Sequence, residues 1–158
     1  MSKFQIRKAT PEDTPTIFNL IYKLAVYEKL ENDVITTVEE LRTNIFEKNY
    51  AEVIIAEEDE KPVGFALYFH NFSTFVGKPG IYLEDLFVEP EMRGKGYGKA
   101  LLVELSKIAK ERNCGRLEWS VLDWNTPSIE FYKSLGAKPM DEWTVFRLNK
   151  EGIENLAK

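Results

Sequence analysis

Six short stretches of the chain carry the residue pattern of β-strands, either by alternating apolar and polar residues or by concentrating β-branched and aromatic ones. An acidic turn joins 51–59 to 61–72, so we expect these two stretches to pair as a hairpin. The stretch 80–90 ends at Pro90, because proline cannot donate to a central strand ladder. The other predicted strands cover residues 4–7, 116–122 and 142–148.

Four further stretches repeat apolar residues every three or four positions, which is the period of an α-helix. The first covers 9–31 and places Ile17, Leu20 and Leu24 on one face. The second covers 36–48 and begins with a Ser/Thr-x-x-Glu capping pattern. The third follows a glycine run, buries an apolar face from Leu101 to Ala109 and ends at 113–115, and the fourth covers 125–137.

The order of these elements predicts the fold class. Reading along the chain gives β-α-α-β-β-β-α-β-α-β. Hairpins produce antiparallel strand pairs and helical crossovers produce parallel ones. We therefore predict a single α/β domain over residues 1–158, with a mixed, mostly antiparallel central sheet flanked by helices.

Composition excludes several classes of protein. A net charge of −5 argues against a general nucleic-acid-binding role, which requires a basic surface. Only one cysteine and one histidine occur, so we expect no intramolecular disulfide, no metal site and a reducing, cytoplasmic compartment. No apolar run is long enough to cross a membrane, and we expect no membrane partner.

The run RGKGYGKALL at 93–102 is the first sign of chemistry. Glycines at 94, 96 and 98 allow positive φ and close approach of a ligand, and unpaired N–H groups at a helix start can face an anion. A flexible basic turn before an ordinary helix is the alternative, and the glycines alone leave both open. The run matches neither G-x-x-x-x-G-K-[ST] nor G-x-G-x-x-G.

The run instead reads R-G-x-G-x-G, and this pattern resembles the acetyl-CoA pyrophosphate loop of the GNAT acetyltransferase superfamily. The segment NTPSIEFYKSLGA at 125–137 fits the family pattern N-x-x-[AS]-x-x-[FL]-Y-x-x-x-G-[AF] at every specified position. The chain is similar nearly end to end to the branch of spermidine/spermine (diamine) and thialysine acetyltransferases. It departs from animal relatives in a short segment at 57–63 and a shorter region after Ala137.

The resemblance implies acetyl-CoA as co-substrate, no metal, and a set of cofactor-binding residues. Backbone groups of Leu86, Phe87 and Val88 would bind the pantetheine arm, and Asn125, Ser128, Tyr132 and Lys133 would line the remaining wall. The pyrophosphate would be held by Arg93, Gly94, Lys95, Gly96, Tyr97, Gly98 and Lys99.

The reaction itself requires a base and an acid. An alkylammonium has a pKa near ~10 and must lose a proton before its nitrogen can attack. Glu84, which matches an amine-contacting residue of the resembled enzymes, is our candidate base, acting through water, and the alternative is a paired structural acid. Tyr132 matches the family's tyrosine near the cofactor sulfur and is our candidate acid; a core tyrosine is the alternative reading of its helix position. Glu84 and Asp85 are adjacent on one strand, so we expect them to point to opposite faces.

The acceptor is expected to be a small cation. Tyr27 and Glu28 match the family's amine-binding pair at the end of the first helix. A polyamine carries several separated charges, and several acids along a groove would suit it, although each acid alone also fits a solvated surface charge. The expected acceptor-binding set is Tyr27, Glu28, Glu84, Asp85, Glu118, Trp119 and Glu142.

These features together predict an N-acetyltransferase that moves an acetyl group to a primary amine of a polyamine, a diamine or a thialysine-like amino acid, by direct attack in a ternary complex. One alternative keeps the reaction but uses a protein lysine, an N-terminus or an aminoglycoside as acceptor. Another alternative is a CoA-binding sensor without catalysis. The resemblance also implies a homodimer.

Overall fold

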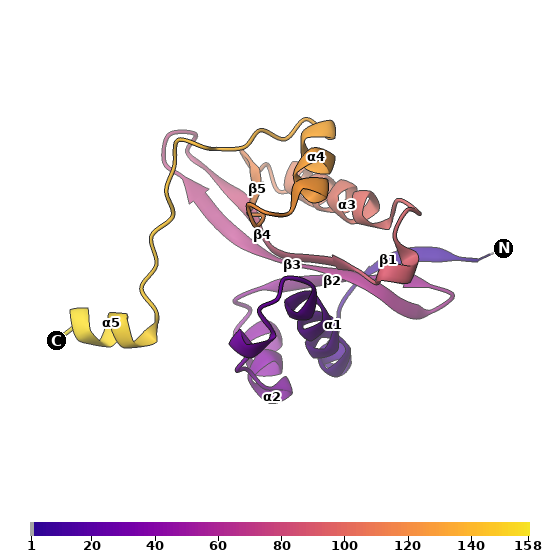
Figure 1. Cartoon of the computed structure of the whole chain (residues 1–158), viewed down its shortest axis with the longest axis horizontal. Helices are drawn as coiled ribbons and strands as arrows, with labels where there is room; N and C mark the ends of the chain where they lie inside the picture. The colour runs from indigo at the N-terminus through magenta and orange to yellow at the C-terminus, as the bar shows by residue number, and fades with distance from the viewer. Residues whose placement is uncertain (1) are drawn as a thin grey trace. The chain divides into compact units, whose positions relative to one another are not determined.

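A computed structural model describes residues 2–158, whose contacts divide into one unit ending at Ser120 and a second unit over Val121–Lys158. The first unit contains a five-stranded sheet in the order β1-β2-β3-β4-β5 (Figure 1). Its first three strand pairs are antiparallel, and β4 and β5 are parallel. The strands are β1 (Phe4–Lys8), β2 (Glu52–Glu58), β3 (Lys61–Ser73), β4 (Lys78–Val88) and β5 (Leu117–Trp119). The mixed sheet and the 51–72 hairpin are therefore confirmed.

The helices follow the predicted order with adjusted ends. They are α1 (Thr14–Tyr27), α2 (Val38–Arg42) and α3 (Tyr97–Glu111) in the first unit, and α4 (Thr126–Ser134) and α5 (Lys150–Leu156) in the second. The predicted helix at 9–31 begins as a separate 3-10 turn at Pro11–Asp13, where the N–H of Thr14 donates to the carbonyl of Pro11. Pro15 has no N–H to make the next bond, so a regular helical ladder starts only after this turn. The predicted second helix continues from α2 as a π-helical turn over Thr43–Glu47.

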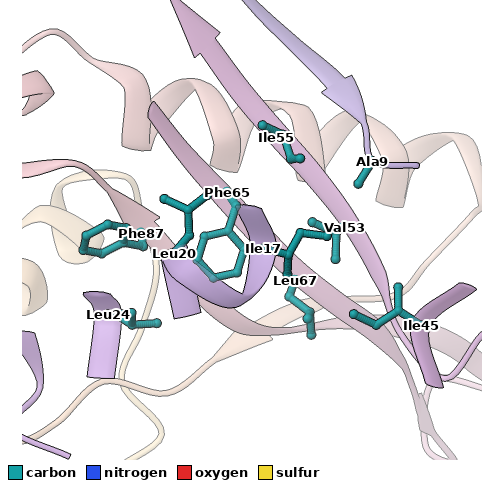
Figure 2. Close-up of a cluster of buried hydrophobic side chains, with 10 residues drawn as sticks. All are labelled: Ala9, Ile17, Leu20, Leu24, Ile45, Val53, Ile55, Phe65, Leu67 and Phe87. Carbon is teal, nitrogen blue, oxygen red and sulfur yellow. The ribbon is translucent and has the colours of Figure 1, made fainter. Parts of the chain in front are cut away.

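The main core lies between α1 and one face of the sheet. Figure 2 shows Phe65 on β3 close to Leu20 on α1, with Val53 and Ile55 on β2 beside them. These strand residues lie two apart, so they share one face, and the α1 residues follow helical spacing toward it. The cluster consists of Ala9, Ile17, Leu20, Leu24, Ile45, Val53, Ile55, Phe65, Leu67 and Phe87.

The other face of the sheet is covered by α3. Figure 1 shows α1 and α2 on one side of the sheet and α3 on the opposite side. Leu101, Leu102 and Leu105 are buried on α3, which contacts β2, β3 and β4. Because α3 is packed along its length, the loop that leads into it is attached to a rigid helix.

A β-bulge interrupts the pairing of β3 with β4. Leu67 lies opposite Asp85 and Tyr68 opposite Leu83, so Glu84 is an extra residue on β4 without a partner across the ladder. A bulge of this kind breaks the two-residue alternation of the strand. The alternation on which the expectation of opposite faces for Glu84 and Asp85 rested is therefore interrupted at this place.

The predicted strand at 142–148 is wrong. The structure gives this segment no ladder, and its Trp143, Val145 and Phe146 are 73%, 80% and 90% exposed. The sequence has strand propensity, but a strand forms only when an edge supplies hydrogen-bond partners, and residues 2–158 supply none here. The helix α5 was not predicted from the sequence. Its N-cap residue, Asn149, could have indicated it, because the side chain of Asn149 accepts a hydrogen bond from the N–H of Gly152 at 2.9 Å.

Candidate active site

The glycine run forms an open loop between β4 and α3. Gly94 and Gly96 have φ of +85° and +83°, a region that disfavours residues with a side chain. A Cβ atom added to either glycine would meet nothing within 4 Å, so space for a ligand lies beside both. Gly96 is the N-cap of α3 and has no side chain to occupy the first N–H groups of the helix. The residues of this loop fit a pyrophosphate, whose binding there stays a prediction.

The end of β4 next to this loop lacks a neighbour on one side. In the described part of the chain, β5 pairs with β4 only from Ile81 to Leu83. Leu86, Phe87 and Val88 lie beyond that ladder, with Phe87 and Val88 buried and Leu86 half-buried. An extended ligand can add to such a strand edge through backbone hydrogen bonds. This arrangement suits the pantetheine arm expected there.

The side chain of Arg93 contacts Tyr27, at the end of α1, and the end of β4. Its guanidinium carbon lies 4.7 Å from the ring centre of Tyr27 and 5.8 Å from that of Phe87. Its Nε–H donates to the backbone oxygen of Val88 at 3.2 Å. A guanidinium over an aromatic face is a favourable cation–π contact. Arg93 therefore joins the loop to the end of α1, and its guanidinium lies over one face of the Tyr27 ring.

The other predicted loop residues divide into two groups. Lys95 and Tyr97 contact Glu58, at the end of β2. Gly98 and Lys99 lie in the first turn of α3, where Lys99 is exposed. Glu58 was not among the residues expected from the sequence, because an acid at the end of a strand carries no local sign of a distant partner.

Three carboxyl groups interact beside the bulge. Asp85 is half-buried, and burial, with added repulsion from Glu84 and Glu28, raises its pKa to about 7. Burial and the charge of Glu84 also raise the pKa of Glu28, which follows α1 directly. Glu84 itself is exposed. We call Glu28, Glu84 and Asp85 the carboxyl cluster; it is a region where a cation would relieve repulsion.

An ion pair fixes α1 beside this cluster. Nζ of Lys23 lies 2.5 Å from Oε2 of Glu89, just after the end of β4. Lys23 is on the same helix as Tyr27, about one turn earlier. The sequence pattern did not single out either partner, because the pair joins segments that are far apart along the chain.

Three more residues were predicted to bind the acceptor: Glu118, Trp119 and Glu142. Oε1 of Glu118 accepts a hydrogen bond from Nδ2 of Asn71 and forms an ion pair with Nε of Arg116, each at 3.0 Å. Its role in acceptor binding stays a prediction. Trp119 lies opposite Leu83 in the β4–β5 ladder and is half-buried. Glu142 lies in the exposed segment that forms no strand.

The second unit carries the remaining predicted cofactor residues. Asn125 is buried and caps α4, because its Oδ1 accepts from the N–H of Ser128 at 3.4 Å. Tyr132 is half-buried on α4, and Lys133 is exposed. The pattern N-x-x-[AS] therefore has a local structural use, since it starts the helix that carries Tyr132.

Two kinds of feature are absent from residues 2–158. No group of three or more His, Cys, Asp or Glu side chains there is arranged to hold a metal ion. No described helix is both long and apolar enough for a membrane span.

The chain resembles known proteins along nearly its whole length. Residues 17–137 match the Acetyltransferase (GNAT) family. A thialysine N-epsilon-acetyltransferase of Bos taurus is 37% identical over 169 residues, covering 99% of each chain. A spermidine/spermine N(1)-acetyltransferase-like protein 1 of Homo sapiens is 34% identical over 99% of this chain and 24% of its own length. Among solved structures, an integron cassette protein of V. cholerae superimposes with a TM-score of 0.82, at 31% identity and 98% coverage of each chain.

The raised pKa of Asp85 predicts a pH-dependent stability. Between about pH 4 and about pH 7 the folded chain keeps a proton on Asp85 that the unfolded chain loses, so this group's contribution to the free energy of unfolding falls as pH rises. We expect Asp85→Asn to flatten that fall in urea titrations across this range. Asp33→Asn, at an exposed acid, is the control and should track the wild type. Parallel curves for Asp85→Asn and wild type would contradict the assignment.

Proposed function

Because the chain belongs to the GNAT acetyltransferase family and is an N-acetyltransferase, we propose that it moves the acetyl group of acetyl-CoA to a primary amine of a small cationic acceptor. The acceptor is a polyamine, a diamine or a thialysine-like amino acid, and the amine attacks directly in a ternary complex. The observation that carries this choice of acceptor is the carboxyl cluster beside the bulge of β4.

The chain offers acetyl-CoA a backbone site. The N–H groups at Gly94, Gly96 and the start of α3 bind the pyrophosphate, and the free edge of β4 from Leu86 to Val88 binds the pantetheine arm. Bound acetyl-CoA supplies the acetyl group and a thiolate leaving group. Asn125, Ser128 and Lys133 remain proposed members of the cofactor wall.

Glu84 and Tyr132 divide the proton transfers between them. Glu84, exposed at the bulge, takes the proton of the acceptor ammonium through water and leaves a nitrogen lone pair free to attack. Tyr132 gives its hydroxyl proton to the departing sulfur, and the proton released from the new amide nitrogen restores the phenol. The balance is one amide and one thiol formed, with one proton released.

The carboxyl cluster provides the selectivity for cations. Burial and the nearby charge of Glu84 raise the pKa of both Glu28 and Asp85, so a positive charge that arrives beside these acids stabilises their charged forms. Glu28 and the exposed edge of Tyr27 form the side of the site that comes from α1. Because Arg93 lies over one face of the Tyr27 ring, that face is not the one that meets the acceptor.

The acceptor class is tested by measuring thiol release from acetyl-CoA with spermidine, putrescine, thialysine, lysine, an aminoglycoside and a lysine peptide. We expect the highest kcat/KM with the small amines, and we expect Glu28→Gln and Glu84→Gln to lower it by roughly 10-fold or more for them. Glu111→Gln, at an exposed residue that ends α3, is the control. A higher kcat/KM with the peptide or the aminoglycoside would contradict the small-amine acceptor and favour the other one. No thiol release with any amine would contradict the enzyme and favour the CoA-binding sensor.

The role of Tyr132 is tested with Tyr132→Phe. Removal of the hydroxyl should lower kcat by roughly 100-fold, the usual contribution of a general acid, while the Kd of acetyl-CoA stays within about 2-fold. Tyr50→Phe, at an exposed tyrosine, is the matched control. An unchanged kcat would show that another group protonates the sulfur.

The phosphate cradle is tested with a pair of glycine variants. Gly96→Ala and Gly77→Ala both place a side chain at positive φ in open space, so both should lose stability by about 1 kcal/mol. Gly77 lies in the β3–β4 turn, away from the loop. Only Gly96→Ala should raise the Kd of CoA, by roughly 5-fold or more. Equal affinity of the two variants would contradict the cradle.

We further propose a cytoplasmic homodimer. A second copy would cover the apolar side chains of Trp143, Val145 and Phe146, which are largely exposed in one chain. The single free thiol of Cys114 suits a reducing compartment. Sedimentation equilibrium should give the mass of two chains, and the mass of one chain at micromolar concentration would contradict the dimer.

A further inference from the structure

The acid Glu58 contacts the glycine loop, where a negative charge is unexpected because the loop is proposed to bind an anion. Oε1 of Glu58 lies 3.3 Å from Nζ of Lys95 and also accepts a hydrogen bond from the hydroxyl of Tyr97. Both partners belong to the R-G-K-G-Y-G run. A carboxylate near a pyrophosphate site opposes anion binding through its charge, so its presence calls for another physical explanation.

Glu58 is held firmly from the sheet side. It is the last residue of β2, and it lies opposite Phe4 in the β1–β2 ladder. Its side chain is 11% exposed, against 47% for Lys95. The ring of Phe4 stacks on that of Tyr97 with centres 4.1 Å apart and planes 14° apart. The first two strands therefore present a ring and a carboxylate together to the loop.

The charge states of Glu58, Tyr97 and Lys95 favour the contact between them. The hydrogen bond from Tyr97, with that from Lys95, holds the pKa of Glu58 below its usual value. The bond to Glu58 raises the pKa of Tyr97 above its usual value. At neutral pH the contact joins a carboxylate to a phenol and an ammonium, and such charge-assisted bonds are the stronger kind.

We infer that Glu58 is a positioning residue, which fixes Lys95 and Tyr97 so that the glycines between and beside them hold the shape that binds the pyrophosphate. This inference rests on the proposed function. Gly94 and Gly96 gain flexibility from lacking side chains, and a flexible loop must be ordered before it binds. The side chains of Lys95 and Tyr97, held by Glu58, supply that order, and the backbone of the glycines stays free for the ligand.

A positioning role and a purely electrostatic role predict opposite effects of Glu58→Gln on the Kd of CoA. Removing the negative charge and releasing Lys95 should tighten CoA binding if charge alone matters. If positioning dominates, the Kd of CoA should rise by roughly 3- to 10-fold, the equivalent of one lost hydrogen bond. Tyr97→Phe keeps the stack on Phe4 and the net charge, and it should raise the Kd in the same direction.

The experiment measures the Kd of CoA by calorimetry, kcat and both KM values, and the hydrogen exchange of the amides at 93–99 without ligand. We expect Glu58→Gln to raise the Kd of CoA and the KM of acetyl-CoA, to leave the KM of the amine unchanged, and to speed exchange in the loop. Glu60→Gln, in the exposed turn after β2, is the matched control and should match the wild type in every readout.

Each result decides one claim. A Kd for Glu58→Gln equal to or below that of the wild type, or loop exchange equal to that of Glu60→Gln, would overturn the positioning role. A wild-type chain that binds no CoA would overturn the proposed function instead, and the exchange of the loop amides would still decide whether Glu58 orders it.

Discussion

The pairing of β4 is the constraint on which the rest of the molecule depends. This strand lies between β3 and the edge strand β5 and contributes Phe87 to the core, yet its ladder to β3 contains the bulge at Glu84 and its ladder to β5 ends at Leu83. A strand that stays paired throughout would have neither a displaced carboxylate nor a free edge. Both irregularities occur at neighbouring residues, so the proposed base and the proposed surface for the pantetheine arm come from one local break in regular structure.

The two sides of the glycine loop are held by different parts of the fold. Arg93 connects it to α1 through Tyr27, and Glu58 connects it to the β1–β2 end of the sheet through Lys95 and Tyr97. The positive side chains of the loop therefore contact the protein, and the backbone faces open space at Gly94 and Gly96. Since Glu28 follows α1 directly, the glycine loop and the proposed acceptor side of the site both adjoin the end of this helix.

Much of this arrangement was predictable, and the failures have physical reasons. The hairpin and the helical stripe of Leu101, Leu102 and Leu105 are local patterns, and the structure confirms them. The strand at 142–148 failed because a strand needs an edge as well as a propensity. The partners of Glu118, Arg116 and Asn71, could not be read from the sequence, because neither adjoins it along the chain. The single-domain extent of 1–158 and the roles of individual site residues stay predictions.

The sequence by itself determined the family, the order of the elements up to α4, and the position of the glycine loop. It could do so because glycine spacing and apolar periodicity are properties of consecutive residues. Only the tertiary structure decided that Glu84 stands at a bulge, that Asp85 and Glu28 repel it across two elements, and that Glu58 reaches the loop from β2. Register and contact join residues dozens of positions apart, and no local pattern encodes which of the many acids will meet.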